Sequence, residues 1–393
     1  MTLPAAVTDR LDRQMAFLTE ADKLKSVLRH NVLMDLSRAE NVAEHSWHVA
    51  LWAIVLAPDM PAGCDLARAI AMLLIHDIVE IDAGDHSVAV AYDPDEIAAK
   101  EQAAAARLFP LLPPDQAKMV DSLWREFEAI QTPTAVYAKR IDHMQPILQV
   151  FLAPSWHNGH PEIAGHTLTQ GRAKRMAQDW PELDRIARSL MRGETPPDSD
   201  LMRRLRFLAE ADRLKSVTRA TRVLSGARHE NSAEHSWHVA LYALLLGEHA
   251  KRPVRTDRVV QMLILHDLVE IDAGDAPVFG TSDAAATQDA EQAAADRLFG
   301  LLPPAEGTRL RALWQEFEDN QSADANFAKS LDRFNPPNLN IAAGGGSWVD
   351  YRVDRARFDS AVGAKIEAGA PILWQWIAPR AHAMIDRLQA EQA

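Results

Sequence analysis

The sequence lacks the features of disulfide-linked, membrane-spanning and nucleic-acid-binding proteins. Cys64 is the only cysteine among 393 residues, which leaves no intramolecular disulfide, cysteine-based zinc site or CxxC redox motif. The apolar runs, such as 49–57 and 69–75, are shorter than the roughly 20 residues of a membrane-spanning helix. The formal net charge of −13 disfavours a nucleic-acid backbone as a partner. We therefore expect neither a membrane nor a nucleic acid as a partner.

The N-terminal segment also lacks a targeting signal. Residues 1–17 contain no basic stretch followed by an apolar one, so we expect no signal peptide and a cytoplasmic location. A single cysteine agrees with a reducing compartment. The acidic balance still permits a small phosphorylated ligand, because a metal ion and a few arginines reverse the potential inside one cleft.

The chain contains one unit written twice. The segment AEHSWHVAL begins at Ala43 and again at Ala233, which is 190 residues later. With the same offset, HDIVEIDAGD at His76 returns as HDLVEIDAGD at His266. This period far exceeds that of solenoid repeats and indicates duplication of a whole domain. The polar, proline-containing segment 193–200 predicts a boundary, with domains at 1–197 and 198–393.

Hydrophobic periodicity in each unit is helical. Trp47, Ala50, Leu51 and Ile54 follow i, i+3, i+4, i+7 spacing. Residues 69–79 are expected to form a mostly buried helix, and 101–111 and 116–128 two further ones. No convincing alternating run predicts a strand. We therefore expect an all-α fold of two tandem bundles, each with about six to eight helices.

Each half carries residues that can hold a metal ion. They comprise a lone histidine, a His-Asp doublet and a later aspartate: His45, His76, Asp77 and Asp142 in the first half, and His235, His266, Asp267 and Asp332 in the second. A lone histidine is usually an ordinary core or surface residue. A His-Asp doublet inside an apolar run is costly to bury unless it is paired or ligated. This donor set suits Mn²⁺, Co²⁺, Fe²⁺, Ni²⁺, Zn²⁺ or Mg²⁺, with histidine favouring a transition metal.

The order H…HD…D, within AEHS and HDxVEIDAGD, resembles the HD superfamily of metal-dependent phosphohydrolases and its branch of 5′-deoxynucleotidases. The resemblance covers nearly all of each half. It implies one divalent cation per half, held by the residues above. It further implies an acid/base role for Glu80 and Glu270, and substrate contacts from Arg29, Arg219, Arg38, Arg228, Asp85 and Asp275.

Several of these residues admit a second interpretation. Glu80 follows His76 by four residues and is predicted to share its helix face. Arg29 and Arg219 would face a phosphate, with Arg38 and Arg228 in support, but an isolated arginine is usually a solvated surface charge. Asp85 and Asp275 would lie near the substrate sugar or cap a helix or turn.

The tryptophans and second histidines of the AEHSWH segments also admit two interpretations. Trp47 and Trp237 would stack on a base or pack in the core. His48 and His238 would support the ligand histidine or the fold.

The two halves differ after the last ligand aspartate. Glycines 344–346 follow Asp332, whereas the segment after Asp142 has no such run. These glycines would let the backbone approach a ligand or would form a flexible loop. The difference argues against identical substrates for the two halves.

The function predicted from these features is divalent-metal-dependent hydrolysis of a small phosphomonoester, such as a (deoxy)nucleoside 5′-monophosphate. Dinuclear HD oxygenases and phosphodiesterases need further histidines before the last aspartate, and only His86 stands there in the first half. The alternative is a nucleotide-binding regulatory or scaffold protein, although both halves keep the glutamate that a sensor does not need.

We also expect the halves to pack as an internal pseudo-dimer. Duplication often fuses the partners of a twofold dimer, whose interface is self-complementary. Equivalent helices should then meet across a pseudo-twofold axis.

Overall fold

A computed structural model describes residues 3–86, 93–156, 159–281 and 283–392. Both halves are mainly helical. The elements of the first half are α1 (Ala5–Ala21), η1 (Asp22–Ser26), β1 (Leu28–Val32), β2 (Ala39–Asn41), α2 (Val42–Val55), α3 (Leu66–Ile75), α4 (Glu80–Ala83), α5 (Pro94–Leu108), α6 (Pro114–Ala129), α7 (Pro133–Leu152), α8 (His160–Thr169), α9 (Met176–Asp179) and α10 (Pro181–Met191).

The second half repeats this order up to its seventh α-helix. Its elements are α11 (Asp200–Ala211), η4 (Asp212–Ser216), β3 (Thr218–Arg222), β4 (His229–Asn231), α12 (Ser232–Leu246), α13 (Thr256–Leu265), α14 (Glu270–Ala273), α15 (Ala284–Phe299), α16 (Pro304–Asp319), α17 (Ala323–Ala342), α18 (Ser347–Asp350), α19 (Arg355–Phe358), α20 (Ala364–Gly369) and α21 (Pro371–Gln392). The all-α prediction is confirmed, with more helices per half than expected because several have a single turn.

Two local predictions need correction. The helix expected over 69–79 ends at Ile75, and a turn separates it from α4, which begins at Glu80. Each half also contains a two-stranded antiparallel hairpin, β1–β2 and β3–β4, that the sequence did not reveal. Strands of five and three residues are too short to show an alternating pattern.

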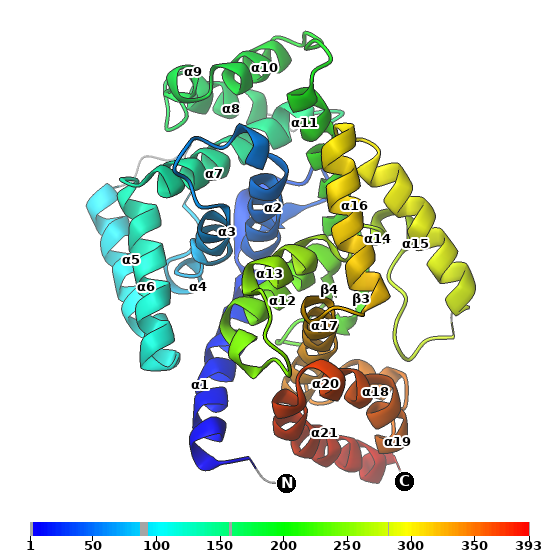
Figure 1. The fold of residues 1–393 in the computed structure, drawn as a ribbon. Helices are drawn as coiled ribbons and strands as arrows, with labels where there is room; N and C mark the ends of the chain where they lie inside the picture. Colours follow the sequence, from blue (N-terminus) through cyan, green and yellow to red (C-terminus); the bar gives the residue numbers. More distant parts are fainter. Residues whose placement is uncertain (1–2, 87–92, 157–158, 282, 393) are drawn as a thin grey trace.

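Helices α2 and α12 lie at the centre of the molecule and pack against each other (Figure 1). Every residue of α2 is buried. A helix that is buried all round must be covered on all sides by other elements. The first half covers one side of α2, through α3 and α7, and the second half covers the other, through α12 and α13.

Contacts between the halves come in equivalent pairs. The Trp47 indole N–H donates to the Ile264 carbonyl (3.0 Å), and that of Trp237 donates to Leu74 (2.9 Å). Both carbonyls lie in the last turn of α13 or α3, where helical partners are missing. His48 bonds the Leu208 carbonyl in the same reciprocal way as His238 bonds that of Leu18. These contacts agree with the predicted internal pseudo-dimer.

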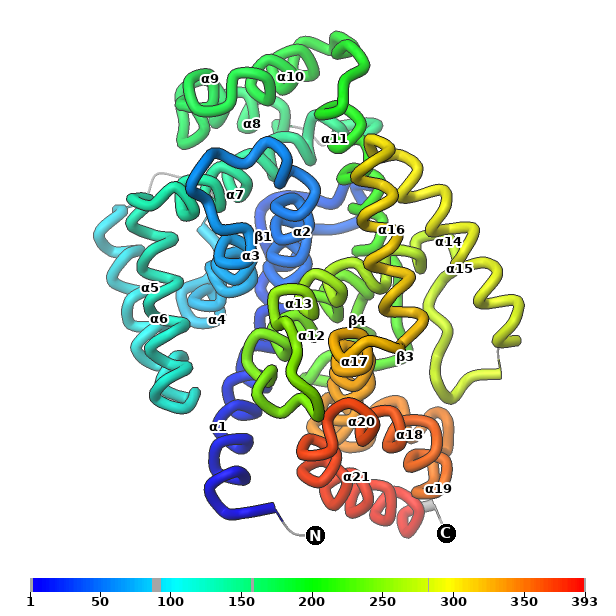
Figure 2. Tube along the Cα trace, in the orientation of Figure 1, coloured from blue at the N-terminus to red at the C-terminus, as the bar shows by residue number. Residues whose placement is uncertain are grey.

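The outer elements surround this centre on four sides (Figure 2). Helices α5 and α6 lie on the side opposite α15 and α16, and α8–α10 lie at the end opposite α18–α21. The predicted boundary at 197 falls in the segment 192–199, between α10 and α11, which contains no helix or strand. Over the described ranges, every helix is too short or too polar to cross a bilayer.

The reciprocal tryptophan contacts generate the first prediction. Trp47→Phe and Trp237→Phe should each lower the free energy of unfolding by about 1–3 kcal/mol, because each leaves a buried carbonyl without its donor. Trp156, which is 47% exposed, supplies the control, since Trp156→Phe should change stability by less than about 0.5 kcal/mol. Urea unfolding measures all three, and equal midpoints for Trp47→Phe and Trp156→Phe would contradict the assignment.

Candidate functional site

The first ligand histidine is positioned by the hairpin and the helix that follows it. Asn41 ends β2 and caps α2, accepting a hydrogen bond from the Glu44 backbone N–H while the Glu44 carboxylate accepts from that of Asn41. This reciprocal capping fixes where α2 begins. His45 is therefore held in the first turn of α2, fully buried. Asn231 and Glu234 form the same capping box before His235.

In the first half, the predicted ligands converge. His45, His76 and Asp142 each offer one ligand atom, and these atoms lie within 4.8 Å of one another. Nε2 of His45 lies 3.3 Å from Asp142 Oδ1, and Nε2 of His76 lies 3.6 Å from the same oxygen. Asp77 is not part of this triplet, but its Oδ2 lies 3.0 Å from His76 Nε2.

The second half repeats this geometry. His235, His266 and Asp332 also offer ligand atoms within 4.8 Å of one another. The distances from Asp332 Oδ1 are 3.1 Å to His235 Nε2 and 3.8 Å to His266 Nε2. Asp267 Oδ1 lies 3.0 Å from His266 Nε2. The predicted ligands of both halves are therefore brought together from three separate elements.

The donor atoms suit a divalent cation. Nδ1 of His76 lies 2.9 Å from the Leu73 carbonyl, which only accepts, so Nδ1 carries a proton. In a neutral ring the Nε2 lone pair then faces Asp77 and Asp142, and this buried atom has no hydrogen-bond partner. Burial lowers the pKa of His76, but these carboxylates outweigh it and raise the pKa to about 10. A metal ion would take the place of that proton.

An arginine lies beside each doublet. Arg29 Nη1 donates to Asp77 Oδ2 (3.0 Å) and lies 3.9 Å from Asp85 Oδ1. Arg219 Nη1 likewise donates to Asp267 (2.7 Å) and lies 3.7 Å from Asp275. Both arginines thus lie at the metal-ligand clusters and are not solvated surface charges.

Glu80 and Glu270 lie close by, although not as expected. Because the helix ends at Ile75, Glu80 does not share a continuous helix face with His76. It begins α4, and its backbone N–H donates to the Asp77 carbonyl across the turn. Burial, together with the charge of Asp77, raises the pKa of Glu80 well above its usual value. The same causes act on Glu270, which accepts a hydrogen bond from Ser232 (2.5 Å).

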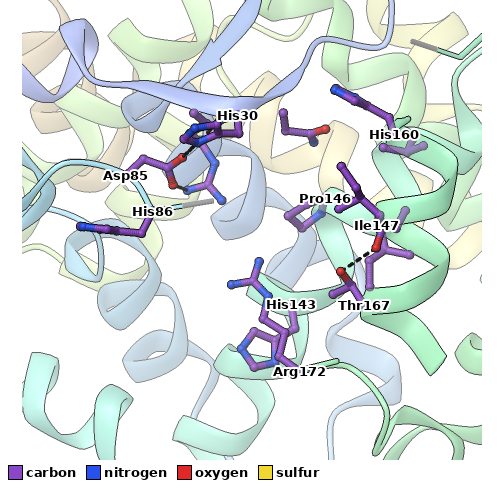
Figure 3. A pocket seen from close by; sticks show the side chains of 14 residues that line it. His30, Asp85, His86, His143, Pro146, Ile147, His160, Thr167 and Arg172 are labelled. Atoms are coloured by element: carbon purple, nitrogen blue, oxygen red, sulfur yellow. Dashed lines mark hydrogen bonds and ion pairs between the residues drawn. The ribbon is translucent and has the colours of Figure 1, made fainter. Parts of the chain in front are cut away.

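A cavity lies beside the first cluster, because Arg29, which pairs with Asp77, forms part of its lining. Figure 3 shows this cavity. Its walls come from β1, the loop after α4, α7 and α8. They carry Arg29, His30, Asn31, Asp85, His86, His143, Pro146, Ile147, Val150, His160, Ile163, Ala164, Thr167 and Arg172. His30 donates its backbone N–H to Asp85 Oδ2, and its ring Nδ1 lies 2.9 Å from the same oxygen. Asp85 therefore lines the cavity and ties the loop to the hairpin.

The equivalent cavity in the second half has a different lining. Alanines Ala220 and Ala276 replace His30 and His86, and Phe279, Trp348 and Tyr351 contribute aromatic surface. Asp275 keeps the position of Asp85. Arg29 and Asp85 thus have identical counterparts in the second cavity, whereas the histidines beside them do not.

Each cavity has a second arginine that sequence reasoning missed. Arg172 lines the first cavity and Arg333 the second. Arg333 directly follows the predicted ligand Asp332, and its Nη1 lies 3.2 Å from Asp332 Oδ2, so adjacency was an available signal. No signal in the sequence pointed to Arg172, because the residue 190 positions later is Val362. The residue 190 positions before Arg333 is likewise uncharged, being His143. The charge is kept but comes from another element.

Arg38 and Arg228, predicted to support the phosphate site, lie at the interface and line neither cavity. Arg38 pairs with Glu44 and donates to the Lys215 carbonyl of the other half (2.7 Å). Arg228 makes the same contacts with Glu234 and Lys25. Sequence proximity to the AEHS motif suggested the site, but the hairpin turns these side chains to the opposite half.

The tryptophans of the AEHSWH segments and the glycine run 344–346 each have a structural role. Trp47 and Trp237 are fully buried and bond to backbone of the opposite half, so they do not stack on a base. Gly346 has φ +48°, and a Cβ there would lie 2.3 Å from Asn340 Oδ1. The glycine run therefore forms a tight turn that holds Ser347 and Trp348 at the second cavity.

Taken together, the helical fold and the paired buried clusters define a duplicated His/Asp metal-site protein. A model of the HD domain matches residues 21–184 and again 211–374. The chain belongs to the HD domain family, and it carries the domain twice.

The relatives that this chain resembles in sequence are named as 5′-deoxynucleotidases. The 5′-deoxynucleotidase HDDC2 of Homo sapiens is 30% identical over 136 residues, which span 34% of this chain and 65% of that protein. That of Danio rerio is 24% identical over 186 residues, spanning 42% and 92%. The alignment with the human protein thus covers slightly less than two thirds of its length.

One solved structure is also similar. It is a predicted metal-dependent phosphohydrolase from Magnetospirillum magnetotacticum, 42% identical, with a TM-score of 0.44. The match covers 50% of this chain and 98% of that one.

The two clusters predict one metal ion each. Elemental analysis after loading with Mn²⁺ or Co²⁺ should approach two ions per chain, and His76→Ala or His266→Ala should each remove one. The physical reason is the loss of an imidazole whose Nε2 points into the cluster. Trp156→Phe, on the surface, should retain both ions. Full metal content in the double histidine variant would refute the ligand assignment.

Proposed function

We propose that this protein is a divalent-metal-dependent phosphomonoesterase acting on (deoxy)nucleoside 5′-monophosphates. The observation that carries the proposal is the same arrangement in both halves. A buried His/His/Asp cluster lies beside a cavity whose lining includes an arginine and an aspartate. The 5′-deoxynucleotidase relatives support this substrate class.

We assign the ligands as His45, His76, Asp77 and Asp142, and the corresponding residues of the second half. Two imidazoles per cluster favour a transition ion such as Mn²⁺ or Co²⁺ over Mg²⁺. Bound there, the ion would lower the pKa of a water molecule and stabilise developing charge on phosphate.

The single cysteine fits a reducing compartment, which we take to be the cytoplasm.

The protein's own side chains would bind the phosphate and transfer protons. Arg29 and Arg219 can bind phosphate oxygens through the planar guanidinium fork, moving from the aspartate that each now pairs with. Arg172 and Arg333 place a second cation in the same cavity. Burial lowers the pKa of His143 to about 3, so Arg172 supplies the charge there. Glu80 and Glu270 would hold or move the proton of the attacking water or the leaving oxygen.

The proposal predicts phosphate release that depends on the glutamates. Protein loaded with Mn²⁺ or Co²⁺ should release phosphate from nucleoside 5′-monophosphates. The double variant Glu80→Ala, Glu270→Ala should lose about 10²–10⁴-fold in kcat, the usual contribution of general acid–base groups. Its metal content should stay at the wild-type value, because neither glutamate is a ligand in this assignment.

Each alternative gives a distinct result. Nucleotide binding without phosphate release by any metal form would indicate a regulatory or scaffold protein. Release that is unchanged in the glutamate variant would remove the acid/base role. Screening 3′-monophosphates beside the 5′-monophosphates tests the position of the phosphate.

The different cavity linings predict different preferences for the two halves. His266→Ala would leave the first half as the active one, and His76→Ala the second. The kcat/KM values of the two variants, compared over a panel of nucleotides, should differ in relative size by about 10-fold or more for at least one base. The reason is that polar histidines line the first cavity, whereas aromatic and alanine residues line the second. The wild-type rate for each substrate should equal the sum of the two, and identical orders would refute the prediction.

A further inference from the structure

Two lysines are fully buried between the halves. Lys25 in η1 and Lys215 in η4 each have 0% exposed side chain. Burying an ammonium is unfavourable unless it is paired and hydrogen-bonded. Each lysine has an aspartate three residues earlier in its own half, Asp22 or Asp212, as one partner.

The other partner belongs to the opposite half. Lys215 Nζ lies 2.7 Å from Glu40 Oε1, and Lys25 Nζ lies 3.0 Å from Glu230 Oε2. Lys215 Nζ also lies 3.0 Å from His48 Nδ1. Glu40, His48 and Asp212 have the spacing of a cation site, and the ammonium contacts all three. That position is thus filled by a lysine.

The second oxygen of each glutamate faces the metal cluster. Glu40 Oε2 lies 3.5 Å from Arg29 Nε and 3.7 Å from His45 Nδ1. Glu230 Oε1 lies 3.6 Å from Arg219 Nε and 3.4 Å from His235 Nδ1. These buried glutamate and arginine atoms have no other hydrogen-bond partner, and neither does His235 Nδ1. A small movement would pair them.

A ligand histidine needs such an acceptor. When Nε2 of a neutral imidazole binds a metal, Nδ1 carries the proton and donates it to a nearby carboxylate or carbonyl, which orients the ring. In the first half, Gln145 Oε1 also lies 3.1 Å from His45 Nδ1. In the second, the shorter Asn335 bonds His238, which leaves Glu230 as the acceptor nearest His235.

We propose that Lys25 and Lys215 are positioning residues that act across the interface. Through Glu230 and Glu40, each lysine holds the metal-ligand histidine and the phosphate arginine of the opposite half. The inference rests on the proposed metal sites. It means that each site is complete only when the other half supplies its lysine, and that the second site depends on its lysine more strongly.

A crossover experiment with Co²⁺ tests this. His266→Ala leaves the first site as reporter, and His76→Ala leaves the second. Lys25→Met or Lys215→Met is added to each, and Co²⁺ affinity is measured from the visible absorption of the bound ion. Lys215→Met should weaken binding about 10–100-fold at the first site, and Lys25→Met at least as much at the second, as for loss of a residue supporting a ligand. KM for substrate should rise with the weakened site.

The two lysine variants control each other, because they remove equivalent buried charges and should destabilise the fold equally. Equal effects on both sites, or an effect of each lysine on its own half, would overturn the inference. If the methionine variants do not fold, Glu40→Gln and Glu230→Gln keep a group that Lys Nζ can bond to. Each should then weaken Co²⁺ binding at the site of its own half, and an equal effect of each on both sites would overturn the inference. A reporter that still binds two Co²⁺ ions would instead refute the proposed ligands.

Discussion

The mutual burial of α2 and α12 is the constraint on which the rest of the structure depends. Neither helix has a face in water, so each needs its own bundle on one side and the other half on the other. A half on its own would expose that apolar surface, which monomeric proteins avoid. His45 and His235, which we assign as metal ligands, lie in the first turns of these same helices. The metal clusters are therefore built directly beside the interface.

The C-terminal ends of α3 and α13 form a second connection between the interface of the two halves and the metal clusters. Each helix stops just before its His-Asp doublet, and its last carbonyls need donors from elsewhere. One donor is the doublet's own histidine, and another is a tryptophan of the opposite half. The same few backbone groups thus orient His76 and join the halves, which explains why the motifs around them survived duplication in both copies.

The two cavities share an arginine and an aspartate but differ in much of the rest of their lining. Histidines line part of the first cavity, where alanine and aromatic residues line the second. The second cation is Arg172 after α8 in the first cavity and Arg333 on α17 in the second. Each cavity thus has a second positive charge, which a different part of the chain supplies in each half.

The sequence by itself determined the duplication, the helical class and the residues that converge as His45, His76 and Asp142, because periodicity and motif spacing are local properties of the chain. It did not reveal the short hairpins, the turn that breaks the helix at His76, the interface position of Arg38 or the cavity position of Arg172. Those depend on which surfaces meet. Lys25 and Lys215 show the reason most clearly. Each lies more than 170 residues from the glutamate it pairs with, and only the packing of α2 against α12 brings the two charges together.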